Sequence, residues 1–385
     1  MSQTSKTAWW IVGIVIVVVI VISVSKGGAN NSGPIKIGII APLTGDAAGY
    51  GEPARNVFQM AANEINSSGG INGRSVQLVI EDSKCDGKDG ASAAQKLISI
   101  DKVQVIIGDV CSGATLGELP VTEGARVALF SAGASSPDLT GKSPYFSRDY
   151  PSDASQGMVL ADEAARLGYK KVVFAQEQTD YALGLYNTFK AEFAKSGGQT
   201  TEEQLPSDAP DTRSILLKLQ ADKPDMLFID TQTTALSGRI LTQLENLGWK
   251  VPIFMNDVSI GTPQLLLDNK GILEGAIGAE FKVSDSTKFT NLLSTYKSTY
   301  GIDMAYESYG QTEYDALYLV RDAIAAVGYD GVKIAQWLRT VKGWPGASGS
   351  VTIDPMTGDR IGGHSLEIVK NGVSQPYTVA TSTPQ

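Results

Sequence analysis

The chain has 385 residues, of which 42% are hydrophobic and 19% charged, so it can hold two globular domains and is neither a disordered tail nor a fibre. Its 32 basic and 41 acidic residues give a net charge of −9, which repels phosphate backbones and excludes non-specific nucleic-acid binding. One histidine, His364, and two cysteines, Cys85 and Cys111, exclude a His/Cys metal cluster and leave histidine-based catalysis to a single residue.

An apolar run lies near the start of the chain. Ala8–Val24 is apolar except for Gly13 and Ser23, and as a helix it would span about 25 Å, the short limit for crossing a bilayer. We expect a retained membrane anchor; the alternative is a cleaved signal peptide with Ser25 near the cleavage site. Both place the rest of the protein on the extracytoplasmic side, and residues 25–33 are then a flexible tether.

Strands and helices alternate in the next part of the chain. Ile35–Ala41 is Ile-rich without clean alternation, which indicates a strand covered on both faces. Apolar residues of the following segment recur at spacings of three and four, which predicts a helix that ends at Ser67–Gly70. The other segments of this series are strands at 75–81, 103–107 and 127–130, with helices at 89–100 and 113–124.

The same rhythm restarts after Asp149 and predicts a second α/β series. Its helices are expected at 153–167, 181–196, 212–221 and 236–247, and its strands at 171–175, 199–205, 226–229 and 252–255. Helices at 287–300, 306–327 and 332–341 follow, and strands at 349–353 and 364–370 come last. The expected fold class is therefore α/β, with two doubly wound parallel-sheet lobes that the chain revisits near its end.

The two cysteines lie 26 residues apart, each just after a predicted strand. In an oxidising compartment we expect Cys85 and Cys111 to pair, which would stabilise the fold by about 3.5 kcal/mol in the chain-entropy model. Two buried free thiols are the alternative.

Ligands of open parallel sheets bind beyond the carboxyl ends of the strands, so the segments there are candidate binding loops. Tyr50, between two glycines, could cover a ligand from an adaptable loop or be an ordinary turn residue. Ser112 is a candidate N-cap of a helix whose first amides could bind an anion. Ser131–Ser136 offers small residues with amides and hydroxyls suited to a carboxylate.

Two loops of the second series complete the candidates. Tyr181 follows one strand, and Asp257 follows another as an isolated carboxylate suited to an ammonium group, although a surface acid would look the same. His364 is expected in a late strand away from all these loops, as a surface or structural residue.

Several catalytic motifs are missing from the sequence. It contains no G-x-x-x-x-G-K-[ST], G-x-G-x-x-G, G-x-S-x-G or H-E-x-x-H segment. We therefore expect no bound cofactor, no metal site and no enzymatic activity; a hydrolase or transferase is the weakest alternative.

Six segments, in the same order, resemble leucine/isoleucine/valine-binding proteins, the extracytoplasmic substrate-binding components of branched-chain amino-acid ABC transporters. They are Ile37–Gly45, Gly49–Gly51, Ala62–Gly73, Ile107–Ser112, Ala134–Thr140 and Asp180–Gly184. The resemblance runs from about residue 35 to 380. It implies a type I periplasmic-binding-protein-like fold, in which two lobes joined by three crossovers close on a ligand. The implied lobes are 34–149 with 281–352, and 150–280 with 353–385.

The resemblance also implies a set of ligand-binding residues. The α-carboxylate of an amino acid would meet Ser112 and the loop of Gly133, Ala134 and Ser135. The α-ammonium would meet Asp257, where the branched-chain binders carry a glutamate. The remaining positions would surround the ligand side chain: Tyr50, Val110, Tyr181, Tyr309, and Thr233 in place of an aromatic residue.

The function expected is a receptor that delivers an amino acid, branched-chain or otherwise apolar or aromatic, to the permease of an ABC importer. The alternative is a sensing ectodomain of the same fold for amides, urea or aromatic acids that acts on a partner protein.

Overall fold

The computed structural model describes residues 33–378, and all statements below concern that part of the chain. The expected membrane anchor, residues 8–24, lies outside the described residues. Within the described part, none of the helices has the length and apolar character needed to span a membrane.

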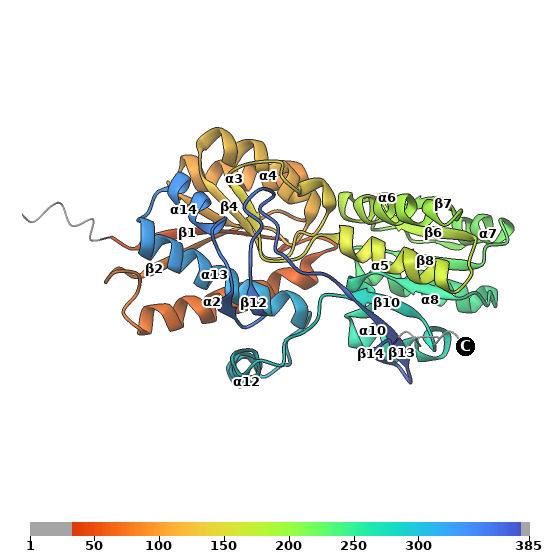
Figure 1. The fold of residues 1–385 in the computed structure, drawn as a ribbon. Coiled ribbons are helices and arrows are strands. Elements are labelled where there is room, and N and C mark those ends of the chain that lie inside the picture. Colours follow the sequence, from red (N-terminus) through yellow and green to blue (C-terminus); the bar gives the residue numbers. More distant parts are fainter. Residues whose placement is uncertain (1–32, 379–385) are drawn as a thin grey trace, which may run out of the picture. The chain divides into compact units, whose positions relative to one another are not determined.

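The first sheet has five parallel strands in the order β2-β1-β3-β4-β5 (Figure 1). Its strands are β1 (Ile35–Ala41), β2 (Val76–Asp82), β3 (Val105–Ile107), β4 (Ala128–Ser131) and β5 (Phe146–Arg148). Six of the seven β1 residues are buried, which agrees with a strand covered on both faces.

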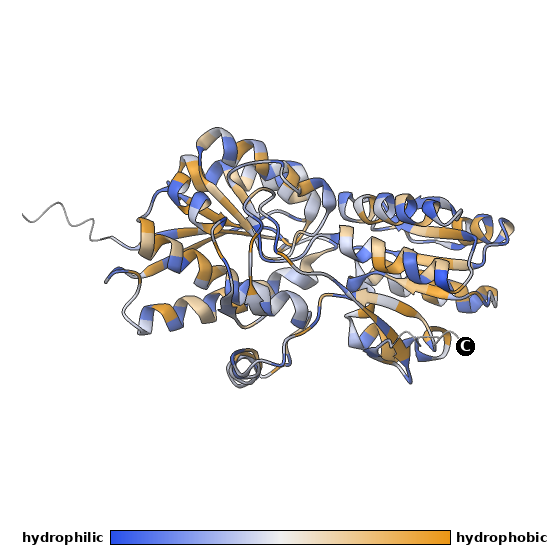
Figure 2. Ribbon diagram, viewed as in Figure 1, coloured by the Kyte–Doolittle hydropathy of each residue, from blue (hydrophilic) through white to orange (hydrophobic). Residues whose placement is uncertain are grey.

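Helices cover both faces of the first sheet. One face packs with α2 (Ala48–Ser67), α12 (Thr287–Tyr300), α13 (Glu307–Val327) and α14 (Gly331–Leu338), and the other with α3 (Gly87–Ser99) and α4 (Ser112–Ala125). The apolar stripe predicted for the first helix is buried: Ala54, Val57, Phe58, Ala61, Ala62 and Ile65. Figure 2 shows the strands as mostly hydrophobic, whereas the helices carry both kinds of residue.

The second sheet has seven strands in the order β14-β13-β10-β9-β8-β6-β7. The five from β10 to β7 are parallel, and β13 and β14 add an antiparallel edge. The strands are β6 (Lys171–Glu177), β7 (Gln199–Leu205), β8 (Met226–Asp230), β9 (Ile253–Met255), β10 (Ile277–Glu280), β13 (Ser365–Lys370) and β14 (Val373–Pro376). The sheet is therefore mixed at one edge, because a hairpin from the end of the chain extends a parallel sheet.

The second sheet is also covered on both faces. One face packs with α5 (Asp153–Arg166) and α6 (Asp180–Lys195), and the other with α7 (Arg213–Ala221) and α8 (Thr234–Leu247). The short helices are η1 (Pro137–Leu139), α9 (Asp257–Ile260), α10 (Pro263–Asp268) and α11 (Lys270–Leu273), and β11 (Trp344–Gly346) pairs with β12 (Gly349–Val351).

The chain passes between the sheets three times. It leaves the first sheet after β5, returns after β10 to form the helices α12 to α14, and leaves again after β12 to form β13 and β14. The lobe boundaries at 149, 281 and 353 stay a prediction.

Two reciprocal ion pairs join the connecting segments. Arg148 Nε lies 2.7 Å from Asp359 Oδ1, and Arg360 Nη1 lies 3.0 Å from Asp149 Oδ1. The guanidinium of Arg360 also lies over the Phe281 ring, 4.7 Å from its centroid. Residues from all three connections between the sheets thus contact one another in one buried cluster.

Candidate functional site

A disulfide fixes the first loop of the candidate site. Cys85 and Cys111 are bonded, as expected for an oxidising compartment. Ser112 is not the N-cap that the sequence predicts: Cys111 holds that position, and Ser112 is the first residue of α4. Its hydroxyl oxygen instead accepts a hydrogen bond from the amide of Ser136, at 3.1 Å. The proton of the Ser112 hydroxyl thus remains available to a ligand.

The loop after β4 is held in shape by buried polar contacts. Ser131 Oγ accepts from the amide of Ala134 at 2.9 Å and donates to the carbonyl of Asp109 at 2.8 Å. Arg148 donates to the carbonyls of Ala134 and Ser136, at 3.0 and 2.9 Å. The carbonyls of the loop are therefore turned towards the arginine.

Gly133 brings this loop against the aromatic residues of the site. A Cβ at this position would lie 2.9 Å from Val110 Cγ1 and 3.1 Å from Tyr309 Cδ1, closer than side chains pack. Only glycine fits here without displacing a neighbour.

The aromatic residues expected at the ligand lie in one buried cluster. Tyr50, Tyr181 and Tyr309 belong to it, and Val110 packs against it. Tyr150, which the sequence analysis did not single out, stacks on Tyr309 with ring centroids 4.9 Å apart.

Tyr50 is not on an adaptable loop. It lies in the first turn of α2, with 6% of its surface exposed. A Cβ on the neighbouring Gly51 would lie 2.2 Å from the carbonyl oxygen of Pro42. The glycine therefore permits a close backbone contact rather than loop motion.

Asp257 is surrounded by tyrosine hydroxyls. It is the first residue of α9, directly after β9, and 3% of its surface is exposed. Tyr150 and Tyr309 donate to Asp257 Oδ2 at 3.0 and 3.1 Å, and Tyr181 donates to Oδ1. The carboxylate is thus buried and is not the isolated surface acid that was the alternative.

Burial raises the pKa of all three tyrosines well above 10, and the nearby Asp257 charge adds to the shift. Their hydroxyls therefore stay protonated and act as donors to the carboxylate.

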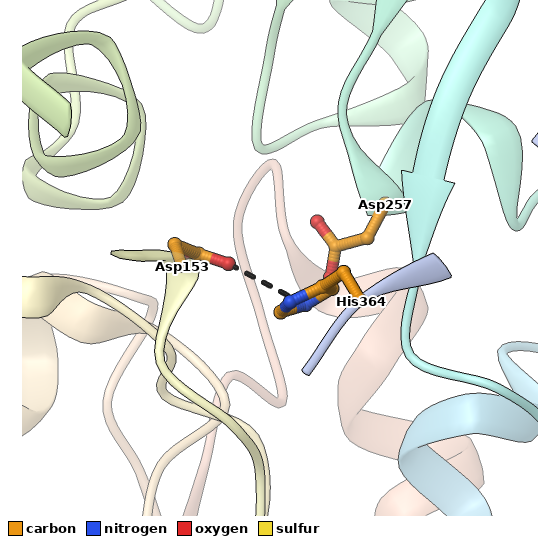
Figure 3. A group of neighbouring side chains, drawn as sticks. All are labelled: Asp153, Asp257 and His364. Carbon is orange, nitrogen blue, oxygen red and sulfur yellow. Dashed lines mark ion pairs between the residues drawn. The ribbon is translucent and has the colours of Figure 1, made fainter. Parts of the chain in front are cut away.

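The expected position of His364, on a late strand away from the binding loops, is wrong, whereas nothing contradicts the structural role that was the other expectation. The residue lies just before β13 rather than on a surface strand, and its ring is buried against the α5 and α9 starts, where Asp153 and Asp257 stand (Figure 3). His364 Nε2 is 3.7 Å from Asp153 Oδ1, and Asp153 Oδ2 accepts from Ser135 Oγ at 2.6 Å. The Ser135 hydroxyl proton is therefore already used within the protein.

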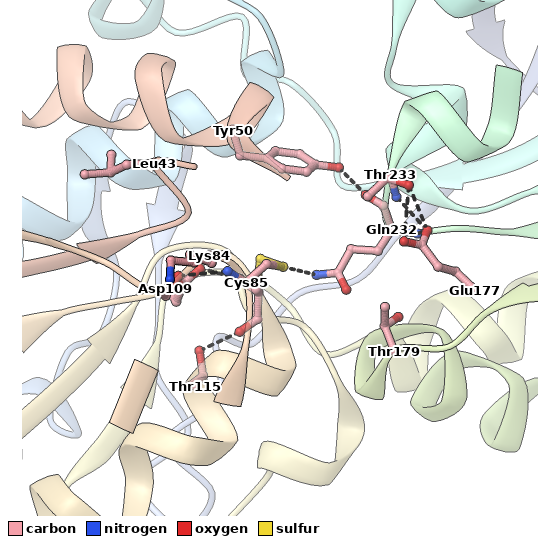
Figure 4. The surroundings of a disulfide bond; sticks show 12 residues. Leu43, Tyr50, Lys84, Cys85, Asp109, Thr115, Glu177, Thr179, Gln232 and Thr233 are labelled. Atoms are coloured by element: carbon pink, nitrogen blue, oxygen red, sulfur yellow. Dashed lines mark hydrogen bonds between the residues drawn. A yellow bond between two sulfur atoms is a disulfide. The ribbon is translucent and has the colours of Figure 1, made fainter. Parts of the chain in front are cut away.

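Thr233 binds a different acid, Glu177. Its amide donates to Glu177 Oε2 at 2.8 Å and its hydroxyl to the same carboxylate at 3.2 Å. The neighbouring Gln232 accepts from Tyr50 at its carbonyl, at 2.7 Å, and its amide lies 3.3 Å from Cys85 Sγ (Figure 4). These contacts link the β8–α8 loop of the second sheet to Tyr50 and to the Cys85–Cys111 disulfide, which belong to the first sheet's half of the protein. Beside them lies a cavity of about 380 Å³ lined by residues of both halves.

Three residues of the site were missed by sequence reasoning: Tyr150, Asp153 and His364. Tyr150 and Asp153 stand in the segment between the two predicted series, which was taken only as a connection and a helix start. Both follow a short strand, β5, that sequence reasoning did not recognise and that would have marked the segment after it as a candidate binding loop.

The same architecture occurs in known proteins. Residues 34–370 match the family model described as periplasmic binding protein. The Leu/Ile/Val-binding protein BraC3 of Rhizobium johnstonii is 28% identical over 331 residues, covering 84% of this chain and 88% of that protein. The solved leucine binding protein LivK of Thermotoga maritima has a TM-score of 0.80 and 29% identity, over 89% of this chain and 98% of that one.

A solute binding protein of an ABC transporter from Rhodopseudomonas palustris, solved with 3,4-dihydroxy benzoic acid, has a TM-score of 0.75 and 24% identity. It covers 89% of this chain and 96% of that one, and shares the fold. Since the family model spans nearly all the described residues, the chain belongs to the periplasmic binding protein family.

Proposed function

We propose that the protein is an extracytoplasmic receptor that binds an amino acid between its two halves and delivers it to the permease of an ABC importer. One observation carries the proposal: Tyr309 of the buried aromatic cluster lies against Gly133 of the 131–136 loop and bonds the carboxylate of Asp257. Ser112, whose hydroxyl oxygen accepts from Ser136 of the same loop, lies beside it. Tyr309 therefore touches both groups, the loop and the carboxylate.

The two groups recognise the two charged ends of an amino acid. The Ser112 hydroxyl and the Ser135 amide would bind the α-carboxylate, since the amides of Gly133, Ala134 and Ser136 already donate within the protein, and Asp257 would bind the α-ammonium. Tyr50, Val110, Tyr181 and Tyr309 would contact the ligand side chain, with Thr233 at the margin. An aspartate is one methylene shorter than a glutamate, so the ligand must approach α9 closely.

Closure follows from binding, because a ligand held by both halves stabilises the closed form by its differential affinity. In this proposal residues 34–149 and 281–352 form one lobe, and residues 150–280 and 353–385 form the other. The names of BraC3 and LivK support a branched-chain amino acid as the ligand. The proposal also includes other apolar or aromatic amino acids.

The test is calorimetric titration of the purified full-length protein with the twenty amino acids and with 3,4-dihydroxybenzoate. We expect at least one amino acid to bind, and Asp257→Asn to weaken its binding about 30-fold or more, because a buried charge loses its partner. Asp268→Asn, on the exposed surface of α10, is the matched control. Binding of the benzoate alone, or of an amino acid with equal affinity to Asp257→Asn, would contradict the proposal.

We propose that residues 8–24 hold the receptor at the extracytoplasmic face of the membrane. Membrane-fraction protein should then start upstream of residue 8 in N-terminal sequencing. A released protein that starts near residue 26 would instead show signal cleavage.

A further inference from the structure

Three acceptor side chains meet inside the proposed site. Asp153 begins α5, Asp257 begins α9 and His364 precedes β13, so they come from three distant segments (Figure 3). One ligand atom of each lies within 4.8 Å of those of the other two. All three are buried, and the side chains of Asp153 and His364 have no exposed surface.

The hydrogen-bond network assigns the proton of the imidazole. His364 Nδ1 lies 2.7 Å from Ser155 Oγ, and Ser155 Oγ donates its hydrogen to the carbonyl of Ser152 at 3.0 Å. A hydroxyl has one hydrogen, so Nδ1 must be the donor to Ser155. Nε2 is therefore the ring's unprotonated acceptor, and among the described residues it has no hydrogen-bond partner.

Burial favours the same neutral ring. It lowers the pKa of His364 from 6.5 to about 4, which outweighs the opposing charge of Asp257. At neutral pH the ring is uncharged and its lone pair at Nε2 points into the cluster.

The hydrogen-bond donors around the cluster bind its two acids. Asp153 accepts from Ser135 and, at 3.3 Å, from Gln156, whereas the hydroxyls of the tyrosines bind Asp257. None of these donors binds His364 Nε2, which has no hydrogen-bond partner among the described residues. Burial and the nearby Asp257 charge raise the pKa of Asp153 well above its usual range, so the cluster holds a costly excess of acceptors. A cation with directional hydrogens, or a metal ion, would offset this cost and give the Nε2 lone pair a partner.

We infer that Asp153, Asp257 and His364 form a tripod that accepts the three hydrogens of a primary ammonium group. The inference rests on the proposed function and narrows its ligand to amino acids with an unsubstituted amine. It assigns Asp153 and His364 to the site beside Asp257, and it disfavours N-alkylated amino acids and acids that lack an amine.

The spacing of the three acceptors admits an ammonium group. A nitrogen that donates at about 2.8 Å in tetrahedral directions reaches acceptors about 4.6 Å apart. A zinc ion with bonds of about 2.0–2.2 Å would draw its ligands to about 3.4 Å from one another. His364 Nε2 and Asp153 Oδ1 are 3.7 Å apart, between these two values, and all three ligand atoms lie within 4.8 Å of one another. The choice of an ammonium over a metal therefore rests on the proposed function, which already places an α-ammonium at Asp257.

The test compares the tightest-binding amino acid of the twenty with its N-methyl derivative, by calorimetry on the full-length protein. The wild-type protein should bind the primary amine at least 10-fold more tightly, because methylation removes one of three donors. His364→Leu should weaken binding of the primary amine about 10-fold and bring the ratio of the two affinities towards one. His364→Gln, which places an oxygen near the Nε2 position, should restore part of the preference.

A purely structural role of His364 would lower both affinities together and leave their ratio unchanged, which would overturn the tripod while the proposed function stands. If the wild-type protein binds no amino acid, the proposed function fails and this inference with it. A third arm titrates EDTA-treated protein with Zn²⁺ and with Mn²⁺. One equivalent of metal that binds the wild type, is lost in His364→Leu and competes with the amino acid would make the cluster a metal site and overturn the inference. Asp268→Asn is the control for all arms.

Discussion

At the scale of single residues, the missing Cβ atoms of glycines set how closely the loops of the site approach each other. Gly133 lies against Val110 and Tyr309, and Gly51 lies against the backbone of Pro42. Both contacts position tyrosines of the aromatic cluster, because Tyr309 packs on the first glycine and Tyr50 precedes the second. Small residues here act by permitting contact rather than by adding flexibility.

We predict that Gly133→Ala weakens amino-acid binding and lowers the free energy of unfolding by about 1–3 kcal/mol, the usual cost of overpacking. The added methyl must displace Val110 or Tyr309, and Tyr309 bonds Asp257. Chemical denaturation and calorimetry measure the two effects.

Gly124→Ala is the control, since a Cβ there has no atom within 4 Å and lies in α4. Alanine should raise stability there, by at most about 1 kcal/mol, without changing affinity. Equal effects of the two substitutions would refute the role given to Gly133.

At the scale of elements, the connections between the sheets are held by buried arginines rather than by apolar packing alone. Arg148 is fully buried at the end of β5 and bonds Asp359, Thr140 and two carbonyls of the 131–136 loop. One side chain thus joins a connecting segment to a binding loop.

Arg148→Met should lower the free energy of unfolding by about 3–5 kcal/mol, because it leaves the carboxylate of Asp359 without its cation and removes a donor from two buried carbonyls. Lys195→Met breaks an exposed ion pair of the same 2.7 Å length, with Glu192, and should cost at most about 1 kcal/mol. Denaturant titration of both variants measures the difference. Similar losses of unfolding free energy in the two variants would mean that the buried ion pair stabilises the protein no more than the exposed one.

Much of the element order could be predicted from the sequence, because long apolar stripes and Ile- or Val-rich runs depend only on local pattern. Strand β1 and helix α12 have the bounds expected. The strand β5 could not be predicted, because its three residues include the buried Arg148, whose partners lie far along the chain.

The candidate site likewise contains residues whose neighbourhood could be predicted from the sequence and residues for which it could not. Asp257 and Ser112 follow strands that are readable from sequence, so their neighbourhood could be expected from sheet topology. His364 could not, since its place depends on where the last pass of the chain enters the second sheet. The ligand-binding roles of these residues stay predictions.

At the scale of the whole molecule, several buried acids make stability depend on pH. Desolvation in α13 raises the pKa of Glu313 to about 8 from 4.5. Between these values the folded protein holds a proton that the unfolded chain releases, so the stabilisation is complete below about pH 4.5 and is lost as the pH rises to about 8.

The free energy of unfolding should therefore fall with rising pH, by up to about 1.4 kcal/mol per unit from this residue. Glu313→Gln should flatten the dependence of the melting temperature on pH in that window. Its stability relative to the wild-type protein should therefore be higher above pH 8 than at acidic pH. Glu123→Gln, on the exposed surface of α4, should leave the slope unchanged. A slope that persists in Glu313→Gln would assign it to other buried acids.

The order in which the fold is completed follows from the position of α13. This helix covers a face of the first sheet, yet it is made from residues 307–327, long after β1 to β5. A nascent chain that has grown only through β5 exposes that apolar face and cannot yet bury it. We therefore expect the first sheet to be incompletely covered until residues 307–327 have been made, so a chain cut after β5 should not fold stably.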